Sequence, residues 1–417
     1  MVKILSLWVL LCMLALMPSG VRAVEQLSLS DAISIALTKN PEVIRANREI
    51  DASRGRFWQG ISLPPTTVSV AYENVPVGEK AKHYRERVVE IEQSFDFPTT
   101  YGLRGKSLAA ETKVANASFT NVQQTIIQQV KIAYYTAVAL RSKMELAEEN
   151  RKIAEDFSRK ADSRFTHGES TRLEKLTATV QYTQAQNDVV IARNRFQMAM
   201  GDLLYSLGRD RYDVSTSIVL TDSLVYQPHF AKMDSLFQSA RQSNPELRAN
   251  SFRVKSAAMN RALAWSSLLP SLSLGYNRVT TSNEESSYGV IFGMSVPLWF
   301  MFDQRGQIQE ATANLRKTES DLTTVENLVR LEVQNAFLEL NTQEQQVLLY
   351  QSDLLPQAKE VYRVASSSFE TGEISYIEYL QAKQSLIAME SEYIDALLSV
   401  KSAMAKLEKA VGKELHP

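Results

Sequence analysis

The hydrophobic and polar residues of this chain follow two different periods. In residues 271–280 and 287–297 large apolar residues fill every second position, and the same alternation occurs near residues 65–74 and 86–97. A period of two is that of a β-strand with one apolar face and one small or polar face. The pattern therefore predicts two pairs of strands, each pair joined by a polar stretch.

Long helical segments follow each pair of strands. In residues 104–165 and 305–369 the apolar residues recur at helical spacing, and glycine is almost absent beyond the opening turn. A helix of about 60 residues would be about 90 Å long, and its narrow apolar stripe is typical of coiled-coil packing. Both segments end at a Phe-x-x-Gly-Glu motif, after which residues 174–207 and 378–411 are predicted to return as a second helix.

The chain contains this pattern twice. Asn40-Pro41-Glu42 recurs as Asn244-Pro245-Glu246, and Phe-Thr-His-Gly-Glu at 165–169 recurs as Phe-Glu-Thr-Gly-Glu at 369–373, each 204 residues later. Proline cannot continue a helix but is acceptable at its first position, so each Asn-Pro-Glu is predicted to end one helix and begin another. The period is far longer than the roughly 20 to 50 residues of solenoid repeats. We therefore predict two fold-sized tandem repeats, over residues 24–230 and 231–417.

The first 23 residues have the pattern of a secretory signal peptide. Lys3 precedes an apolar run over residues 4–17, and Val21-Arg22-Ala23 has the small-x-small pattern of a cleavage site. The alternative is a membrane anchor, but the run is shorter than the roughly 20 residues that span a bilayer. The single cysteine, Cys12, lies within this run, so the mature protein is expected to have neither a thiol nor a lipid.

Composition excludes several classes of protein. The net charge of −1 gives no electrostatic footprint for nucleic acid. After the predicted signal peptide, no apolar run is long enough for a membrane helix. If the mature chain crosses a membrane, it must do so as strands of a closed barrel, since hydrocarbon tolerates only helices and closed barrels.

Two isolated pairs of strands cannot close a barrel by themselves. An unpaired strand edge in a membrane costs several kcal/mol for each exposed backbone group, so other chains would have to complete the ring. Strands of about ten residues match a membrane barrel, and apolar-out, polar-in alternation is typical of an aqueous lumen. Glu90, Glu92 and Asp96 are tolerable there only if they face water. A soluble antiparallel sheet with one wet face would show the same alternation.

The sequence offers no catalytic site. The four histidines, His83, His167, His229 and His416, are scattered, and there is no His-Glu-x-x-His motif and no phosphate-binding loop. Gly293-Met294-Ser295-Val296-Pro297 misses the nucleophile-elbow pattern at its last position and lies in a predicted strand. We therefore expect no enzyme activity, no metal and no cofactor.

The order and spacing of these features resemble the TolC-type outer-membrane efflux protein family over essentially the whole mature sequence. The features are the duplicated Asn-Pro-Glu, one strand pair per half, and two matching tip motifs. The motifs are Arg164-Phe165-x-x-Gly168-Glu169-Ser170 and Ser368-Phe369-x-x-Gly372-Glu373, the second continuing as Ile-Ser-Tyr-Ile-Glu-Tyr-Leu.

The resemblance implies a mainly α fold with a membrane β-barrel portion. In this family a homotrimer shares one twelve-stranded barrel in the outer-membrane lipid, and its long helices form a periplasmic tunnel. The implied function is a passive channel in the cell outer membrane of Gram-negative type. It would conduct substrates from an inner-membrane pump and a periplasmic adaptor, the membrane fusion protein, to the exterior.

The tips carry the implied binding roles. The tips of this family meet the adaptor, which implies adaptor contact for Gly168, Glu169, Gly372 and Glu373. The second tip is most similar to the branch that works with heavy-metal or drug pumps of the resistance-nodulation-division type. The sequence does not identify the cargo.

The tunnel entrance is implied just after the second tip. Glu378 and Gln381 match positions where acidic residues line the closed entrance in this family, and Glu174 is the corresponding residue of the first half. Ile374 stands where some members carry a basic partner, so a latch made by that charge pair is not expected. Glu174 and Glu378 also lie three residues after Thr171 and Ser375, and each could instead cap its helix.

A second function class explains the helices equally well. A secreted or periplasmic structural coiled-coil protein would have the same long amphipathic segments. That reading gives no reason for two strand pairs of membrane length at matched places in the repeat.

Overall fold

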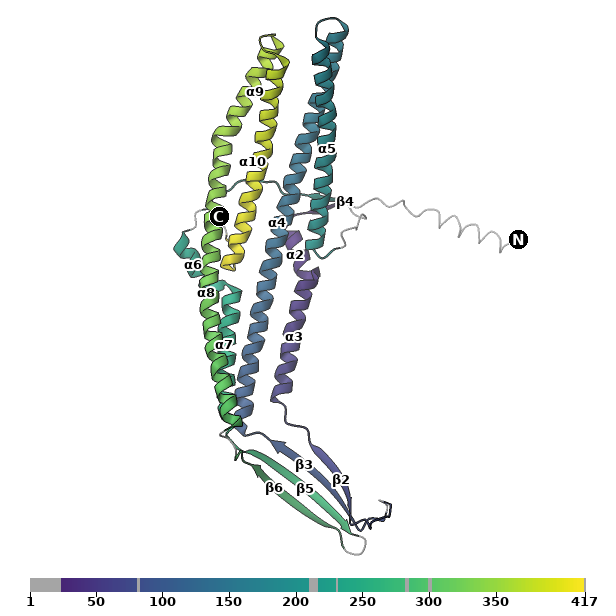
Figure 1. Cartoon of the computed structure of the whole chain (residues 1–417), viewed down its shortest axis with the longest axis vertical. Helices are drawn as coiled ribbons and strands as arrows, with labels where there is room; N and C mark the ends of the chain where they lie inside the picture. Colours follow the sequence, from purple (N-terminus) through teal and green to yellow (C-terminus); the bar gives the residue numbers. More distant parts are fainter. Residues whose placement is uncertain are drawn as a thin grey trace, which may run out of the picture.

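The structure is a computed structural model, and it places an antiparallel sheet at one end of an elongated molecule and two helical hairpins at the other (Figure 1). The predicted signal peptide, residues 1–23, lies outside the residues that the structure describes. The described residues are 24–80, 83–209, 217–229, 232–281, 285–298 and 302–415.

The sheet contains both predicted strand pairs. Its strands are β2 (Thr67–Glu73), β3 (Glu86–Phe95), β5 (Ser271–Thr281) and β6 (Ser287–Ser295), in the order β2-β3-β5-β6. The two pairs join through β3 and β5, which the alternation alone did not indicate. β2, β3 and β6 are shorter than the alternation suggested, and α4 already begins at Pro98, soon after β3.

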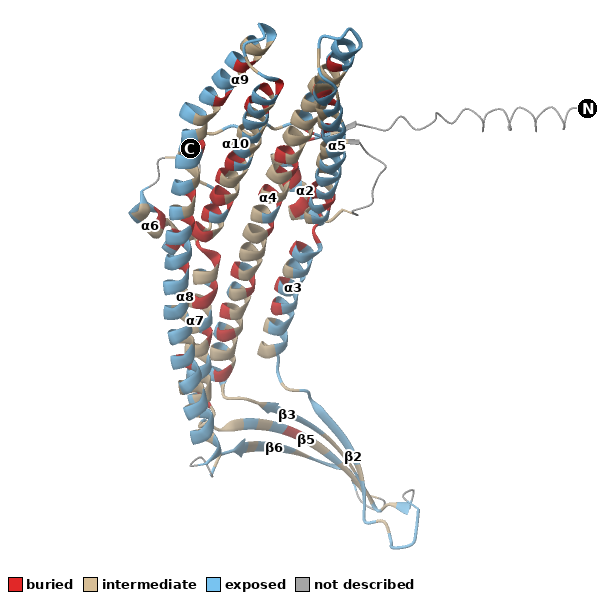
Figure 2. Cartoon of the chain, turned by 45° about the horizontal axis from the view of Figure 1, so that its top comes forward, coloured by how far each residue is buried: buried red, intermediate tan, exposed pale blue. Residues whose placement is uncertain are grey.

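The register of the sheet separates an apolar face from a polar one. Val68 lies opposite Ile91, Ile91 opposite Tyr276, and Tyr276 opposite Val290, and all four side chains are exposed. The neighbouring row, on the other face, consists of Ser69, Glu90, Asn277 and Gly289. Figure 2 shows that the sheet has almost no buried residues, in contrast to the helices. The apolar face therefore has no cover within the described part of the chain.

The long helices differ between the two halves. In the first half α4 (Pro98–Thr166) runs unbroken for 69 residues, about 100 Å at the usual rise, and α5 (Arg172–Ser206) returns along it. In the second half α8 (Asp303–Leu349) and α9 (Leu355–Glu370) are separated by a π-helical turn over Tyr350–Leu354, and α10 (Tyr376–Val411) returns. Pro356 lies two residues after the turn and has no N–H to bond the carbonyl four residues earlier, which explains the irregularity there.

The repeated Asn-Pro-Glu joins two short helices in each half. These are α2 (Leu29–Lys39) with α3 (Pro41–Ile61), and α6 (Met233–Ser243) with α7 (Pro245–Ser266). Asn40 and Asn244 are buried, and each accepts a hydrogen bond at Oδ1 from the N–H of the following glutamate at 2.9 Å. Each also donates from Nδ2 at 2.9 Å, to the carbonyls of Ser206 and Ala410 respectively. The motif is therefore a helix cap that also ties the short helices to the end of the returning helix.

A pair of glycines completes this junction. Gly208 and Gly412 lie 204 residues apart, with φ of 72° and 82°, and a Cβ on either would lie 2.7 Å from the Cα of Asn40 or Asn244. Only glycine combines the left-handed backbone with this close approach.

A short parallel strand pair was not expected from the sequence. β1 (Val24–Leu27) pairs with β4 (Ser217–Leu220) beside α4. The hydroxyl of Tyr134 lies 2.8 Å from the Leu27 carbonyl and 2.5 Å from Oδ2 of Asp222, which also accepts from the Leu29 N–H at 2.8 Å. Each half has its own hydrophobic core around its long helices.

A buried ion pair links the two halves between α4 and α10. Nζ of Lys131 donates to Oε2 of Glu408 at 2.7 Å, and each side chain is 10% exposed. Burial by itself would lower the pKa of Lys131, but the hydrogen bonds and charges of Glu408 and Glu414 outweigh it and raise that pKa. The lysine therefore stays charged in its buried position.

Candidate functional site

The two tips have the same backbone turn. Gly168 and Gly372 both have φ of 78°, and a Cβ on either would contact nothing within 4 Å. The N–H of Glu169 donates to the Arg164 carbonyl, and the N–H of Glu373 to the Ser368 carbonyl, both at 2.8 Å. This is the bonding with which a left-handed residue closes a helix end. The two tips thus share one exposed turn, in which glycine is required for its backbone conformation and not for space.

The acidic residues of the two tips are held differently. Glu169 and Glu373 are both exposed. Oε2 of Glu373 accepts a hydrogen bond from Ser368 at 3.1 Å, whereas the Glu169 side chain makes no hydrogen bond or ion pair to another described residue. Two carboxylates therefore project from the end of the molecule, one fixed and one free to turn.

Glu174 is held by its own hairpin. Its N–H donates to Thr171 Oγ1 at 3.2 Å, so Thr171 caps α5, and its Oε1 lies 3.5 Å from Nη1 of Arg164. Its side chain is only 19% exposed. Burial, and next the charge of Glu174, raise the pKa of Tyr376 to about 12, so the glutamate lies near the start of α10.

Glu378 caps the start of α10. Its Oε2 accepts from the Ser375 N–H at 2.8 Å and from Ser375 Oγ at 2.9 Å, and its own N–H donates to Ser375 Oγ at 3.4 Å. These bonds from Ser375 lower the pKa of the carboxyl group. The residue is nevertheless exposed, and its Oε1 makes no hydrogen bond to the described residues. The cap that the sequence left open is present, and one oxygen still faces solvent.

Gln381 lies on α10 three residues after Glu378 and is also exposed. Residues three apart on a helix share a face. The structure thus brings Glu378 and Gln381 together and places Glu174 on the other hairpin, beside Tyr376.

An aromatic cluster, which the sequence did not reveal, joins the hairpins below the second tip. The ring of Phe157 on α4 stacks on Tyr376 with centroids 4.3 Å apart and planes 7° apart. Tyr379 stacks on Phe369 at 5.2 Å, and its hydroxyl lies 3.3 Å from that of Tyr362. The spacing of Tyr376 and Tyr379 around Glu378 was a signal for it, but Phe157 comes from the other half of the chain.

Two kinds of feature are absent from the described residues. None of the helices there is both long enough and apolar enough to cross a membrane. Three or more His, Cys, Asp or Glu side chains are nowhere grouped, within those residues, so that they could hold a metal ion.

Comparison with known proteins gives matches along most of the chain. The family model described as Outer membrane efflux protein matches residues 33–209 and 236–413. The cobalt-zinc-cadmium resistance protein CzcC of Cupriavidus metallidurans is 20% identical over 393 residues, which cover 94% of this chain and 91% of that protein. The toluene efflux pump outer membrane protein TtgF of Pseudomonas putida is 24% identical over 412 residues, which cover 92% of this chain and 82% of that protein.

The fold is also that of solved channels. The outer-membrane channel OprN superimposes with a TM-score of 0.77 at 14% sequence identity, over 92% of this chain and 89% of that one. At this identity the likeness establishes the shared fold.

Proposed function

Because the chain belongs to the outer membrane efflux protein family, and is an outer-membrane efflux channel rather than an enzyme, we propose that three copies form the outer duct of a resistance-nodulation-division system. Such a channel lies in the outer membrane of Gram-negative cells and extends into the periplasm as a tunnel. It works with a periplasmic adaptor and an inner-membrane pump. One observation carries the proposal. Each lateral side of the described chain has an unpaired strand edge and a stripe of exposed apolar residues, which another copy of the chain could cover.

The sheet supplies the first pair of such surfaces. β2 and β6 are its outer strands, and each leaves one backbone edge unpaired within the described chain (Figure 1). Exposed apolar residues such as Val70 on β2 and Phe292 on β6 surround these edges. Unpaired backbone groups cost several kcal/mol in hydrocarbon, so β6 of one copy is expected to pair with β2 of the next. Three copies of four strands would then close a barrel.

The helices supply the second pair. α5 and α8–α9 lie on opposite sides of the chain (Figure 1), and each carries a stripe of exposed apolar residues. Leu173, Leu176, Val180 and Met198 mark the stripe of α5, and Leu331, Leu338, Leu349 and Val361 mark that of α8–α9. Different surfaces that meet head to tail form a closed ring when the rotation is right. The helical and strand surfaces thus support the same ring of copies.

The tips are the proposed contacts with the adaptor. Gly168, Glu169, Gly372 and Glu373 lie on two exposed turns with one backbone geometry, so a ring of three chains would present six similar turns. A partner with a repeated binding surface can engage such turns together, which multiplies weak contacts.

Glu378, Gln381 and Glu174 are the proposed residues of the tunnel entrance. Glu378 and Gln381 share the exposed face of α10 just after the tip, and the free Oε1 of Glu378 supplies negative charge there. Glu174 would line the entrance but add little free negative charge, because its carboxylate is paired with Arg164. The entrance would therefore favour cations through Glu378 more than through Glu174.

A metal or other cation is the proposed cargo class. The relative CzcC is named for cobalt, zinc and cadmium resistance. In this chain Glu90 and Glu92 belong to the polar face of β3, which would line the barrel. Carboxylates along a water-filled lumen favour cations.

Site-specific photo-crosslinking in cells tests the adaptor contact. A photoreactive residue at Glu169 or Glu373 should capture the adaptor, whereas the same residue at the exposed Arg45 of α3, far from the tips, should not. Capture at Arg45 alone would contradict the proposed docking.

Conductance through lipid bilayers tests the entrance. Glu378→Gln should reduce cation selectivity, whereas Ser375→Ala, which weakens the cap but keeps the carboxylate, should leave it unchanged. Equal selectivity of wild type and Glu378→Gln would leave Glu378 as a helix cap only.

A further inference from the structure

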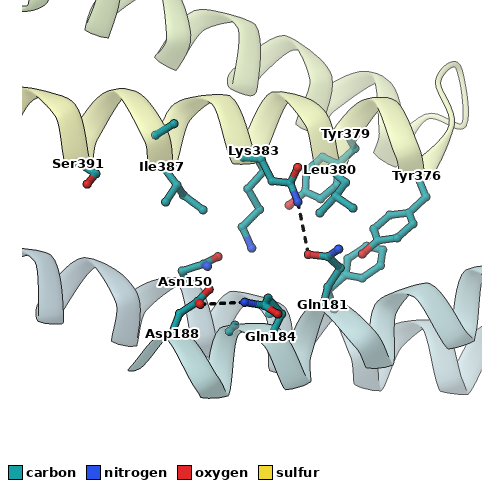
Figure 3. Close-up of a pocket in the computed structure, with 15 residues that line it drawn as sticks. Asn150, Gln181, Gln184, Asp188, Tyr376, Tyr379, Leu380, Lys383, Ile387 and Ser391 are labelled. Atoms are coloured by element: carbon teal, nitrogen blue, oxygen red, sulfur yellow. Dashed lines mark hydrogen bonds between the residues drawn. The ribbon is translucent and has the colours of Figure 1, made fainter. Parts of the chain in front are cut away.

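A cavity of about 380 Å³ lies between the two helical hairpins, close to the aromatic cluster (Figure 3). α10 forms one wall, and α4 and α5 form the other. One part of the lining is apolar, with Ala154, Phe157, Leu380 and Ile387. The rest is polar, with side-chain amides on both walls and Lys383 projecting from α10 across the space (Figure 3).

Within the described residues, Lys383 has no partner for its charge. The residue is 8% exposed, yet its ammonium group makes no hydrogen bond or ion pair to any described residue. The contrast is Lys131 on α4, which is equally buried but is held by Glu408 and Glu414. An ammonium group held in a mostly buried position without an anionic partner is unfavourable, and it offers three donors to any anion that enters.

Only some of the side-chain amides around the cavity make hydrogen bonds to other described residues. Gln184 Nε2 donates to Asp188 Oδ1 at 3.0 Å, and Gln384 Nε2 donates across the cavity to Gln181 Oε1 at 3.5 Å (Figure 3). The Asn150 side chain makes no hydrogen bond to the described residues. It can therefore donate to a bound oxygen beside Lys383.

One other charged group lines the cavity. Asp188 of α5 is half-buried, and it forms no ion pair with Lys383. The remaining ionisable lining groups are the hydroxyls of Tyr376 and Tyr379 on α10, while the lining residues of α4 are not ionisable. Burial raises the pKa of both tyrosines, so they are neutral donors at neutral pH.

We propose that this cavity binds a small organic carboxylate, with the carboxylate on Lys383 and Asn150 and the apolar body against Phe157, Leu380 and Ile387. The lysine provides the charge, and the apolar wall favours an acid with a hydrocarbon or aromatic body over an inorganic anion. A ligand bound here contacts both hairpins, so it holds α10 against α4 and α5 just behind the tips. The proposal does not depend on the adaptor or on the cargo.

Fluorine NMR of the purified full-length protein in detergent tests it directly. The probe is 4-fluorobenzoate, and the matched neutral probe is 4-fluorobenzamide. The benzoate should bind at one site per chain, and the benzamide should bind at least tenfold more weakly. Lys383→Met should weaken benzoate binding about tenfold to a hundredfold, the range for loss of a hydrogen bond to a charged group.

Two further variants control for indirect effects. Lys401→Met removes another partly buried lysine of α10, whose pKa burial also lowers, but which lies over the Tyr135 ring away from the cavity. It should leave benzoate binding unchanged. Asp188→Asn should strengthen binding, because it removes the one carboxylate that lines the cavity.

The pH profile gives an independent readout. Burial lowers the pKa of Lys383 to about 8, so the ammonium group loses its charge as the pH rises above that value. Benzoate binding should therefore weaken over this pH range, in which the protein is expected to stay folded. Absence of benzoate binding, equal binding of the two probes, or an unchanged affinity in Lys383→Met would each overturn the proposal. Weaker binding in Asp188→Asn would also overturn it, because Asp188 would then be positioning Lys383.

Discussion

The two helical hairpins end in the same turn but are stabilised by different interactions. At the first tip ion pairs that are partly exposed join the helices, Arg164 with Glu174 at 3.5 Å and Lys175 with Asp162 at 2.5 Å. At the second tip buried rings pack together, with Phe157 of α4 stacked on Tyr376. Exposed ion pairs contribute about 0 to 1 kcal/mol each, whereas a buried aromatic side chain contributes several.

The difference indicates that the two hairpins are held in place by different kinds of interaction. The second hairpin is anchored to α4 through its aromatic residues, so its position is set by packing against the first half. The two helices of the first hairpin are joined at their tip by charges that salt can weaken. We therefore expect local opening to respond to solution conditions at the first tip and to cavity-forming mutations at the second.

The largest expected effect comes from removing the stacked ring of the second tip. Tyr376→Ala should lower the free energy of local opening of α9 and α10 by about 3 kcal/mol, because a nearly buried aromatic ring is lost. Amide hydrogen exchange of the two hairpins measures this, with Tyr376→Phe as the control that keeps the ring. An equal loss in α4 and α5 would contradict the expectation that the second hairpin depends more on this ring than the first does.

The shared backbone turn should respond equally in both halves. Gly168→Ala and Gly372→Ala should each destabilise their tip by about 1 kcal/mol, because both glycines have φ of 78° and neither Cβ would meet a neighbour. Hydrogen exchange at the two tips provides the comparison. A much larger cost at one glycine would show that its turn is constrained by more than its backbone.

The first tip should be the salt-sensitive one. Arg164→Ala should destabilise the start of α5 by no more than about 1 kcal/mol, and this cost should shrink when the salt concentration rises from about 0.05 M to about 0.5 M. Tyr376→Ala should show no such salt dependence. A salt-independent effect of Arg164→Ala would mean that packing of its alkyl chain, and not its charge, matters at the first tip.

The cap of the second tip should give a small effect that depends on pH. The pKa of Glu378 is lowered in the fold, so its carboxylate stabilises the cap above its ordinary value of 4.5 and loses this effect as the pH falls through the lowered value. The stability difference between wild type and Glu378→Gln should therefore be constant near pH 7 and decline in acid. A difference that grows in acid would contradict the hydrogen bonds to Ser375.

Much of the fold could be predicted from local sequence patterns. The strands of the sheet were predictable because alternation is a property of neighbouring residues, and the tips because glycine and a following cap mark a turn within a few residues. The duplicated Asn-Pro-Glu identified a junction, although its second partner, the carbonyl at the end of the returning helix, is 166 residues away.

Contacts between distant segments could not be predicted. β1 and β4 are only four residues each and pair across most of the first half. The stacking of Phe157 on Tyr376 and the unpartnered Lys383 depend on how the hairpins pack, which no local period encodes. At the candidate entrance the sequence indicated both a cap and a pore residue for Glu378. The structure shows the cap, and the pore roles of Glu174, Glu378 and Gln381 remain predictions.

The mass of the intact assembly tests the central claim most directly, since the proposed duct requires copies of the chain to close both the sheet and the ring of helices. Native mass spectrometry of the full-length protein, released from detergent micelles, should give a species of three chains. Val180→Asp on the exposed stripe of α5 should convert part of it to single chains. A wild-type protein that is only monomeric at every concentration at which it conducts ions would contradict the account.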